Sequence, residues 1–384
     1  MKKVLISMLA IIATIAFITI FSFTGCKTTT SETTSAGTTA VETTVAETTS
    51  AETTSAETTV AETTNNTTKI GKYSIKYAPG KNVSDLNIAV VYLNMTIPAA
   101  AIYKLGVDKV VKETGVNAYM TGPDVWDTAA QYKVVEDLIT KGVDGIAVAI
   151  LDIPGMTPII QKALEAGIPV VCWNVDAPAS GRFSFTGQDL VFCGAESAKA
   201  LISYMGEKGN VIISSVAATA DFVLKREMGA RQVLYQYPNI HIIGTIEAPG
   251  DEETSYAATE NAFLAYSKNP GIDGIIDLGG TQRLWARLFK EKGIGNINSS
   301  KPIYSVGQDV SFEEPLIQIK EGWATVSYGQ HMVDQPYFAV KQLIEFLKTG
   351  DEGVFETQYT ETWKVDKSNV DQVLKDVQAG NVIG

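Results

Sequence analysis

The residues of this sequence best suited to hold a small molecule are polar side chains at the ends of short apolar runs. In chain order they are Asn174, Asp176, Asp277, Asp309 and Gln330. A ligand hydroxyl both donates and accepts hydrogen bonds, and carboxylate and amide groups supply its partners. Polar groups of these types, gathered at one place, indicate a binding site for a hydroxyl-rich molecule.

The patterns that mark other kinds of site are missing. The sequence has no G-x-S-x-G, no P-loop and no carboxylate pair beside a nucleophile. Its two histidines, His241 and His331, stand far apart, and its three cysteines form no C-x-x-C pair. The net charge is −12, and no lysine or arginine cluster suits nucleic acid. We therefore expect no catalytic activity, metal site, cofactor or nucleic-acid partner.

The elements that position the polar side chains alternate along the chain from about residue 87. Apolar runs predict buried parallel strands at Asn87–Leu93, Gly145–Ile150, Ile168–Asn174, Asn210–Ser215, Gly274–Leu278 and Pro302–Gly307. Amphipathic periodicity predicts helices at Ala99–Glu113, Asp127–Lys141, Thr157–Ala166, Ala195–Lys208, Phe222–Tyr235, Thr254–Ser267, Gln282–Lys292 and Gln335–Lys348. This alternation predicts an α/β fold, and two smaller sheets fit the usual domain size better than one. Such sheets bind ligands beyond the carboxyl ends of their strands.

The first 25 residues resemble a bacterial lipoprotein signal. A positively charged start is followed by an almost unbroken apolar run from Val4 to Phe21, and the small residue Gly25 precedes Cys26. We expect residues 1–25 to be removed and the Cys26 thiol to be acylated, which anchors the chain to the outer face of the cell membrane. The alternative is an uncleaved anchor helix, because the run is near the lower length limit for a membrane span.

Residues 26–68 are expected to form a disordered tether. This segment consists mostly of Thr, Ser, Ala and Val, with a glutamate every five residues from Glu42 to Glu62. It has few large side chains to bury, so it cannot offset the entropy lost on ordering, and its spaced charges keep it extended. Such a segment suits a stalk, although a neutral spacer would have the same composition.

Several segments of the remaining chain resemble one known family. They are "QYKVVEDLITKGVDGIAVAILD", "ALEAGIPVVCWNVDAP", "FSFTGQD", "LKREMGARQVL", "YPNIHIIGTIEA", "IYSVGQD" and "ATVSYGQ". In order and spacing they resemble the type I periplasmic binding proteins of the ribose/galactose sugar-binding family, over about residues 85–384. The resemblance implies two Rossmann-like lobes with parallel sheets, joined by three crossover segments, with a ligand in the cleft. It places the first lobe at 85–187 and 329–357 and the second at 188–328 and 358–384, in a monomer.

The same resemblance gives roles to individual residues. Asn174 matches a position that hydrogen-bonds sugar hydroxyls, and Asp176 completes an Asn-x-Asp pattern of the family. Arg226 stands in an Arg-x-x-Gly pattern, as the family's ligand arginine does. Asp309 matches a strand-end aspartate, and Gln330 lies near a crossover glutamine. These residues are therefore expected to contact the ligand.

The chain departs from the family where aromatic side chains usually stack on a sugar ring. Ala99 and Ala100 stand where two aromatics are usual, and a third aromatic position falls near Gly250. Other aromatic residues could supply the stacking face, namely Trp173, Trp126 and Tyr103. Otherwise the ligand differs in size or class from a simple pentose or hexose.

Several of these residues also have a purely structural interpretation. Arg226 could be a solvated helix arginine, and Asp309 could cap the following helix. Asn174 and Asp176 could form a turn. Trp173 lies in an apolar strand, where packing in the core is the better expectation. Each interpretation predicts a different position for the side chain.

Two further cysteines, Cys172 and Cys193, lie in the expected globular part. The first falls in a predicted strand and the second near the start of a helix. A disulfide between them is conceivable outside the cytoplasm, but spacing along the sequence does not decide whether it forms.

The sequence supports three hypotheses about function. The first is a transport receptor that closes around a monosaccharide or related polyol and presents it to the permease subunits of an ABC importer. The second is a sensor whose closed form docks to a chemoreceptor or sensor kinase, and the sequence does not separate it from the first. The third is a cell-surface enzyme on an α/β scaffold. A transcription regulator is excluded by the secretion signal and the lack of an N-terminal helix-turn-helix.

Overall fold

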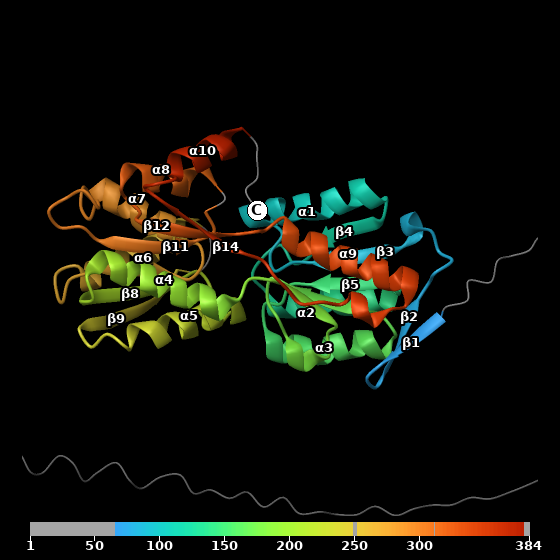
Figure 1. The fold of residues 1–384 in the computed structure, drawn as a ribbon. Helices are drawn as coiled ribbons and strands as arrows, with labels where there is room; N and C mark the ends of the chain where they lie inside the picture. The colour runs from blue at the N-terminus through green and yellow to red at the C-terminus, as the bar shows by residue number, and fades with distance from the viewer. Residues whose placement is uncertain (1–65, 249–251, 311, 380–384) are drawn as a thin grey trace, which may run out of the picture. The chain divides into compact units, whose positions relative to one another are not determined.

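Two six-stranded sheets, each with helices on both faces, make up the part of the chain that the computed structural model describes (Figure 1). That part comprises residues 66–248, 252–310 and 312–379. We call the sheet nearer the start of the chain, with its helices, the first lobe, and the other the second lobe. Both lie within one unit of the chain, residues 61–384.

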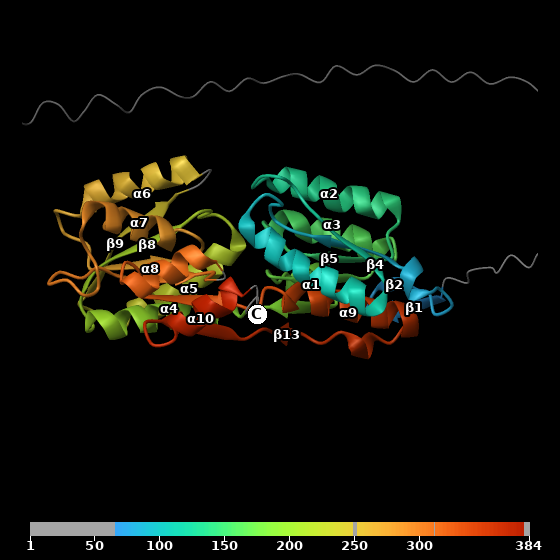
Figure 2. The same ribbon diagram turned by 90° about the horizontal axis from the view of Figure 1, so that it is seen from above.

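The first lobe has a parallel sheet in the order β13-β7-β6-β5-β3-β4. Its strands are β3 (Asn87–Val91), β4 (Asn117–Thr121), β5 (Gly145–Val148), β6 (Val170–Trp173), β7 (Ser184–Gly187) and β13 (Gln358–Tyr359). Its helices are α1 (Pro98–Thr114), α2 (Thr128–Lys141), α3 (Ile153–Glu165) and α9 (Asp334–Thr349). Helices α1 and α9 pack together on one face of the sheet, and α2 and α3 on the other (Figure 2). A hairpin of β1 (Asn66–Ile70) and β2 (Tyr73–Tyr77) contacts α3 and α9.

The second lobe has the strand order β14-β12-β11-β10-β8-β9, in which β14 runs antiparallel to β12. Its strands are β8 (Gly209–Ser215), β9 (Ile240–Glu247), β10 (Gly274–Asp277), β11 (Tyr304–Gln308), β12 (Val326–Gln330) and β14 (Thr362–Asp366). Its helices are α4 (Leu190–Met205), α5 (Asp221–Leu234), α6 (Glu252–Tyr266), α7 (Gln282–Lys292), α8 (Glu313–Glu321) and α10 (Val370–Gln378). Helices α4 and α5 pack together, and α7 lies between α6 and α8 on the other face (Figure 1).

The chain passes between the lobes three times. The first passage joins β7 to α4, the second joins β12 to α9, and the third joins β13 to β14. Each lobe is therefore assembled from segments that lie far apart in the sequence. This arrangement confirms the predicted fold class, two α/β lobes with parallel sheets joined by three crossovers.

Buried strands and capped helices explain why these segments adopt these structures. All four residues of β5 and all four of β6 are buried, as expected for parallel strands covered on both faces. Three helices begin after an aspartate whose side chain accepts a hydrogen bond from a backbone N–H of the first turn. These aspartates are Asp127 before α2, Asp152 before α3 and Asp189 before α4. The caps fix where each helix starts beyond the strand that precedes it.

The six predicted strands and eight predicted helices are all present. Helices α3 and α4 begin earlier than predicted, because the sequence-based starts at Thr157 and Ala195 overlooked the capping roles of Asp152 and Asp189. The prediction missed the β1–β2 hairpin, the shorter or more polar strands β4, β7, β9, β12, β13 and β14, and helices α8 and α10.

Three predicted boundaries differ from the structure. Residues 66–68, expected to end the tether, belong to β1. Gln358–Tyr359, expected in the second lobe, pairs with β7 of the first. Residues 329–330, expected in the first lobe, end β12 in the sheet of the second. In each case backbone pairing within a sheet, which the sequence does not display, decides the boundary.

The predicted signal peptide, Cys26, the tether up to residue 65 and Gly250 lie outside the described residues. Within the described ranges, no helix combines the length and apolar character needed to cross a bilayer. Cys172 and Cys193 are buried free thiols, so the conceivable disulfide between them is not formed.

Candidate ligand-binding site

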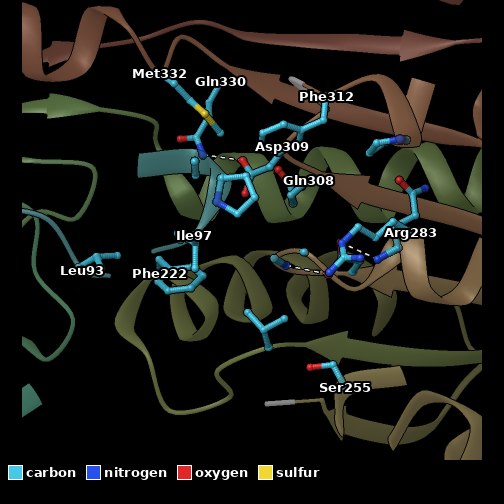
Figure 3. A pocket seen from close by; sticks show the side chains of 18 of the residues that line it. Leu93, Ile97, Phe222, Ser255, Arg283, Gln308, Asp309, Phe312, Gln330 and Met332 are labelled. Carbon is cyan, nitrogen blue, oxygen red and sulfur yellow. Dashed lines mark hydrogen bonds between the residues drawn. The ribbon is translucent and has the colours of Figure 1, made fainter. Parts of the chain in front are cut away.

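A cavity of about 560 Å³ is lined by residues of both lobes, at the carboxyl ends of strands from both sheets (Figure 3). Five of the seven predicted site residues line it: Asn174, Arg226, Asp277, Asp309 and Gln330. Open α/β sheets bind ligands at this edge. The volume lies within the range of small-molecule sites, about 300–1,000 Å³.

Asn174 and Asp309 hold matching backbone positions in the two lobes. Asn174 directly follows β6 and Asp309 directly follows β11, and their φ angles are 63° and 67°. This left-handed region is costly for most side chains, but Asn and Asp tolerate it. Backbone geometry is therefore one reason for the residue type at each strand end. The helix-cap interpretation of Asp309 is wrong, because α8 begins only at Glu313 and has Phe312 at its N-cap.

A buried chain of side-chain hydrogen bonds connects Asp309 to Asn174. Gln330 donates from Nε2 to Asp309 Oδ1 (2.5 Å; Figure 3), and Gln335 donates to Gln330 Oε1 (3.0 Å). Asn174 donates from Nδ2 to Gln335 Oε1 (3.4 Å) and to the Tyr103 hydroxyl (2.8 Å). Gln330 ends β12 and Gln335 lies in the first turn of α9, so this chain follows the second passage between the lobes. It holds one polar group of each lobe in place.

Arg226 is a buried cation without a carboxylate partner in the described part of the chain. Its side chain is 2% exposed. Its Nη1 donates to the Leu278 carbonyl (2.9 Å) and its Nη2 to Gln188 Oε1 (3.2 Å). Buried charges are normally paired, so a guanidinium bonded only to neutral groups beside a cavity has capacity for a ligand. The interpretation as a solvated helix arginine is wrong.

Glycines allow the helix that carries Arg226 to approach its neighbour. A Cβ on Gly229 would lie 1.9 Å from the carbonyl oxygen of Val191, and one on Gly194 would lie 1.9 Å from that of Arg226. Only glycine permits helices α4 and α5 to pack their backbones this closely. The Arg-x-x-Gly spacing of the sequence thus reflects a helix contact that positions Arg226.

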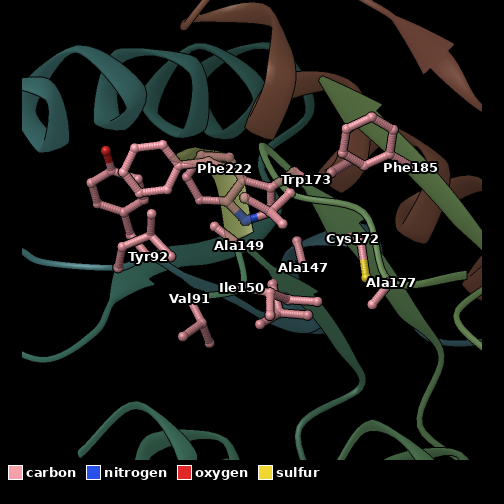
Figure 4. Packing of buried hydrophobic residues seen from close by; sticks show 14 of the residues in the cluster. Val91, Tyr92, Ala147, Ala149, Ile150, Cys172, Trp173, Ala177, Phe185 and Phe222 are labelled. Carbon is pink, nitrogen blue, oxygen red and sulfur yellow. The ribbon is translucent and has the colours of Figure 1, made fainter. Parts of the chain in front are cut away.

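Aromatic side chains contribute to the cavity from both lobes. Tyr92 and Tyr103 line it, and burial raises the pKa of the Tyr92 phenol far above its usual value, so its hydroxyl stays protonated. Trp173 lies outside the lining, fully buried, with its ring stacked on Tyr92 at 5.3 Å (Figure 4). Its core interpretation is confirmed. Trp126 of the first lobe meets Phe222 of the second with ring centroids 6.2 Å apart.

Two predicted contact residues serve the fold. Asp176 is outside the lining and makes two hydrogen bonds with Arg182, at 2.6 and 2.7 Å. Asp277 is at the cavity wall, but its carboxylate accepts hydrogen bonds from the backbone N–H groups of Gly279, Thr281 and Gln282 and from the Thr281 hydroxyl. Burial raises the pKa of Asp277, although these bonds oppose the shift. It orders the loop before α7.

The first two turns of α5 also contact the other lobe. Asp221 Oδ2 accepts a hydrogen bond from the backbone N–H of Ile153 (2.6 Å), and Lys225 Nζ donates to the Asp176 carbonyl (2.9 Å). Together with Phe222 against Trp126, these contacts hold the start of α5 against the first lobe beside the cavity.

Sequence reasoning missed the apolar part of the lining. It includes Leu93, Ile97, Phe222, Phe312 and Met332. Nothing in the sequence distinguishes these residues from core positions, except that Leu93 ends the first predicted strand and Ile97 follows it. Among the described residues, no group of three or more His, Cys, Asp or Glu side chains could hold a metal ion.

Residues 88–352 match the family described as periplasmic binding protein domain. The chain belongs to this family. Similar proteins include a xylitol-binding protein from Mycolicibacterium smegmatis, 27% identical over 51% of this chain, and a D-allose-binding periplasmic protein from Escherichia coli, 24% identical over 68% of this chain and 85% of its own length. The match spans about half of the first curated relatives, 54% of the xylitol-binding protein and 55% of a xylose/arabinose-binding protein from Sulfolobus acidocaldarius.

Solved structures show the same fold. An ABC transporter solute-binding protein from Burkholderia graminis, in complex with D-arabinose, superposes with a TM-score of 0.69 at 23% identity. The superposition covers 75% of this chain and 98% of that one. A glucose-galactose binding protein from Geobacillus stearothermophilus gives a TM-score of 0.66 at 23% identity, over 74% and 98% of the two chains. The two-lobed architecture is thus that of type I periplasmic binding proteins.

Proposed function

We propose that this chain is the extracytoplasmic solute-binding component of an ABC importer and captures a sugar or related polyol between its lobes. The observation that carries this proposal is the placement of Arg226 and Asp309 on one cavity. Both belong to the second lobe, they carry opposite charges, and each is hydrogen-bonded to neutral groups. A guanidinium and a carboxylate together donate to and accept from vicinal hydroxyls. The xylitol, allose and arabinose named for relatives and structural neighbours agree with this ligand class.

Delivery to a membrane permease requires that the protein stay near the membrane. Acylation of Cys26, followed by a tether, would achieve this without a membrane-spanning segment. The proposal therefore includes a lipid anchor on the outer face of the cell membrane and a monomeric receptor that presents its ligand-bound form to permease subunits.

Thermal unfolding with a ligand panel tests the binding function. At a hundredfold excess over Kd, a ligand stabilises the folded state by about 2.7 kcal/mol. For a protein of this size that corresponds to roughly 5–10 °C in Tm. We expect the shift with a member of a panel of pentoses, hexoses, deoxysugars, polyols and glycosides, and a shift of at most about half that size with Asp309→Asn at the same concentration. A shift given by amino acids alone would contradict the proposed ligand class.

A further inference from the structure

The cavity offers few side-chain groups that remain available for hydrogen bonds. Each terminal nitrogen of Arg226 donates one of its two hydrogens to the protein, so one N–H on each remains available. The Nε of Arg226 is buried and has no hydrogen-bond partner among the described residues. Asp309 accepts a hydrogen bond from Gln330 on Oδ1, and its Oδ2 remains available to accept one from a ligand. The Tyr92 hydroxyl and Asn174 Oδ1 have no partner in the described part of the chain.

The other polar residues of the lining are engaged elsewhere. Glu252 and Arg283 form an ion pair with each other. The Ser255 hydroxyl donates to the Ala248 carbonyl, and Gln308 bonds Cys193 and Ser197. The amide nitrogen of Gln282 donates to groups of β11 and β12. Ser255, Gln308 and Gln282 therefore have little capacity for a ligand, and the charges of Arg283 and Glu252 are already paired. Glu314 accepts a hydrogen bond from Gln318 Nε2 (3.3 Å).

The rest of the lining is apolar. The first lobe contributes Leu93, Ile97, Pro98, Ala99 and Trp126, and the second contributes Val216, Phe222 and Phe312. Figure 3 shows Asp309, Gln330 and Met332 in one part of the cavity. The Phe222 ring centroid lies 5.8 Å from the guanidinium carbon of Arg226. Hydroxyls of a ligand can thus meet Arg226 and Asp309, while its hydrocarbon part meets apolar side chains such as Phe222, which lies beside Arg226.

A free hexose fits this lining poorly. It carries hydroxyls around the whole ring, and each hydroxyl buried without a partner weakens binding about tenfold. In contrast, each methylene buried against apolar side chains strengthens binding about fourfold. We propose that the ligand is a sugar with an apolar substituent, a deoxy sugar or an alkyl or aryl glycoside. Arg226 and Asp309 hold its adjacent hydroxyls, and its substituent lies against Ile97, Trp126 and Phe222. This inference rests on the proposed sugar-binding function.

Matched ligand pairs test the inference by titration calorimetry. The pairs are L-fucose and L-galactose, L-rhamnose and L-mannose, and the phenyl β-glycosides of D-xylose, D-glucose and D-galactose with their parent sugars. We expect the substituted member of at least one pair to bind at least tenfold more tightly than its parent. If the parent sugar binds as tightly as its substituted partner, or more tightly, in every pair that binds, the inference is overturned and the proposed function stands. No binding in any pair would overturn the inference, and the thermal-unfolding test with the wider panel of pentoses, hexoses and polyols then decides separately whether the proposed function stands.

Two substitutions locate the effect. Phe222→Ala should reduce the ratio of affinities within the best pair to below threefold. Tyr235→Ala is the matched control, since it removes an aromatic ring just beyond the end of α5, where the side chain is 70% exposed and outside the lining. It should leave both affinities unchanged. A ratio that survives Phe222→Ala in a variant with wild-type far-UV circular dichroism would refute the assigned location.

Discussion

The left-handed backbone of Asp309 allows its conformational and chemical roles to be separated. With φ at 67°, this residue follows β11 and presents its carboxylate to Gln330 and the cavity. Asp309→Ala and Asp309→Gly both remove the carboxylate, but only alanine keeps a Cβ in this region, without the side-chain oxygens that help Asp to tolerate it. Asp309→Asn keeps the backbone preference and removes the charge.

The expected magnitudes follow from these differences. A Cβ in the left-handed region costs about 1–2 kcal/mol, and glycine costs about 0.5–1 kcal/mol in extra backbone entropy. The alanine variant should therefore be about 1 kcal/mol less stable than the glycine variant, which is roughly 2–4 °C in Tm. A hydrogen bond to a charged group contributes about 1.5–3 kcal/mol, so both variants should lose affinity by about ten- to 150-fold.

Thermal unfolding without ligand measures the stability of each variant, and titration of the best ligand measures its affinity. Equal stability of the alanine and glycine variants would show that the backbone conformation places no demand on this residue. Unchanged affinity in the glycine variant would show that the carboxylate does not contact the ligand. Loss of affinity in the alanine variant alone would assign the effect to backbone strain.

Two further predictions concern helix packing and the anchor. Gly229→Ala should lower stability by at least 1–3 kcal/mol, as overpacking does, because the new Cβ meets the Val191 carbonyl at 1.9 Å. Gly80→Ala, with nothing within 4 Å of the added atom, should be neutral, and equal Tm values for the two variants would contradict the helix contact. Cys26→Ala should move the protein from membrane to soluble fractions of fractionated cells. A variant that stays in the membrane fraction would instead support an uncleaved anchor helix.

The sequence predicted the fold well because buried parallel strands leave a simple pattern. Strands such as β5 and β6 are apolar throughout, since helices cover both faces of their sheet. The sequence did not predict strands β7 and β12, because they are not apolar runs. They contain Ser, Thr, Gly and Gln, which are buried in the structure. Buried polar strands have no pattern that separates them from loops.

The candidate site was predicted only in part. Asp277 and Asp309 are both aspartates at strand ends. Both carboxylate oxygens of Asp277 accept hydrogen bonds from loop N–H groups, whereas Asp309 accepts one from Gln330 on Oδ1 and keeps Oδ2 free within the described part of the chain. Hydrogen-bond partners decide this difference, and the sequence does not display them. Phe222 was likewise indistinguishable from a core residue, because its cavity exists only where two lobes meet.

The route of the chain has a consequence for the order in which the protein is completed during synthesis. Helix α9 contacts β3, β5, β6 and β7 of the first sheet. In the sequence, however, most of the second lobe lies between the end of β7 and the start of α9. Until residues 334–349 emerge, one face of the first sheet has only α1 to cover it. A nascent chain therefore exposes apolar strand surface for as long as the second lobe takes to be made, and such exposure favours aggregation. Under the proposed function, export of the unfolded chain, followed by folding of both lobes together, would avoid this intermediate.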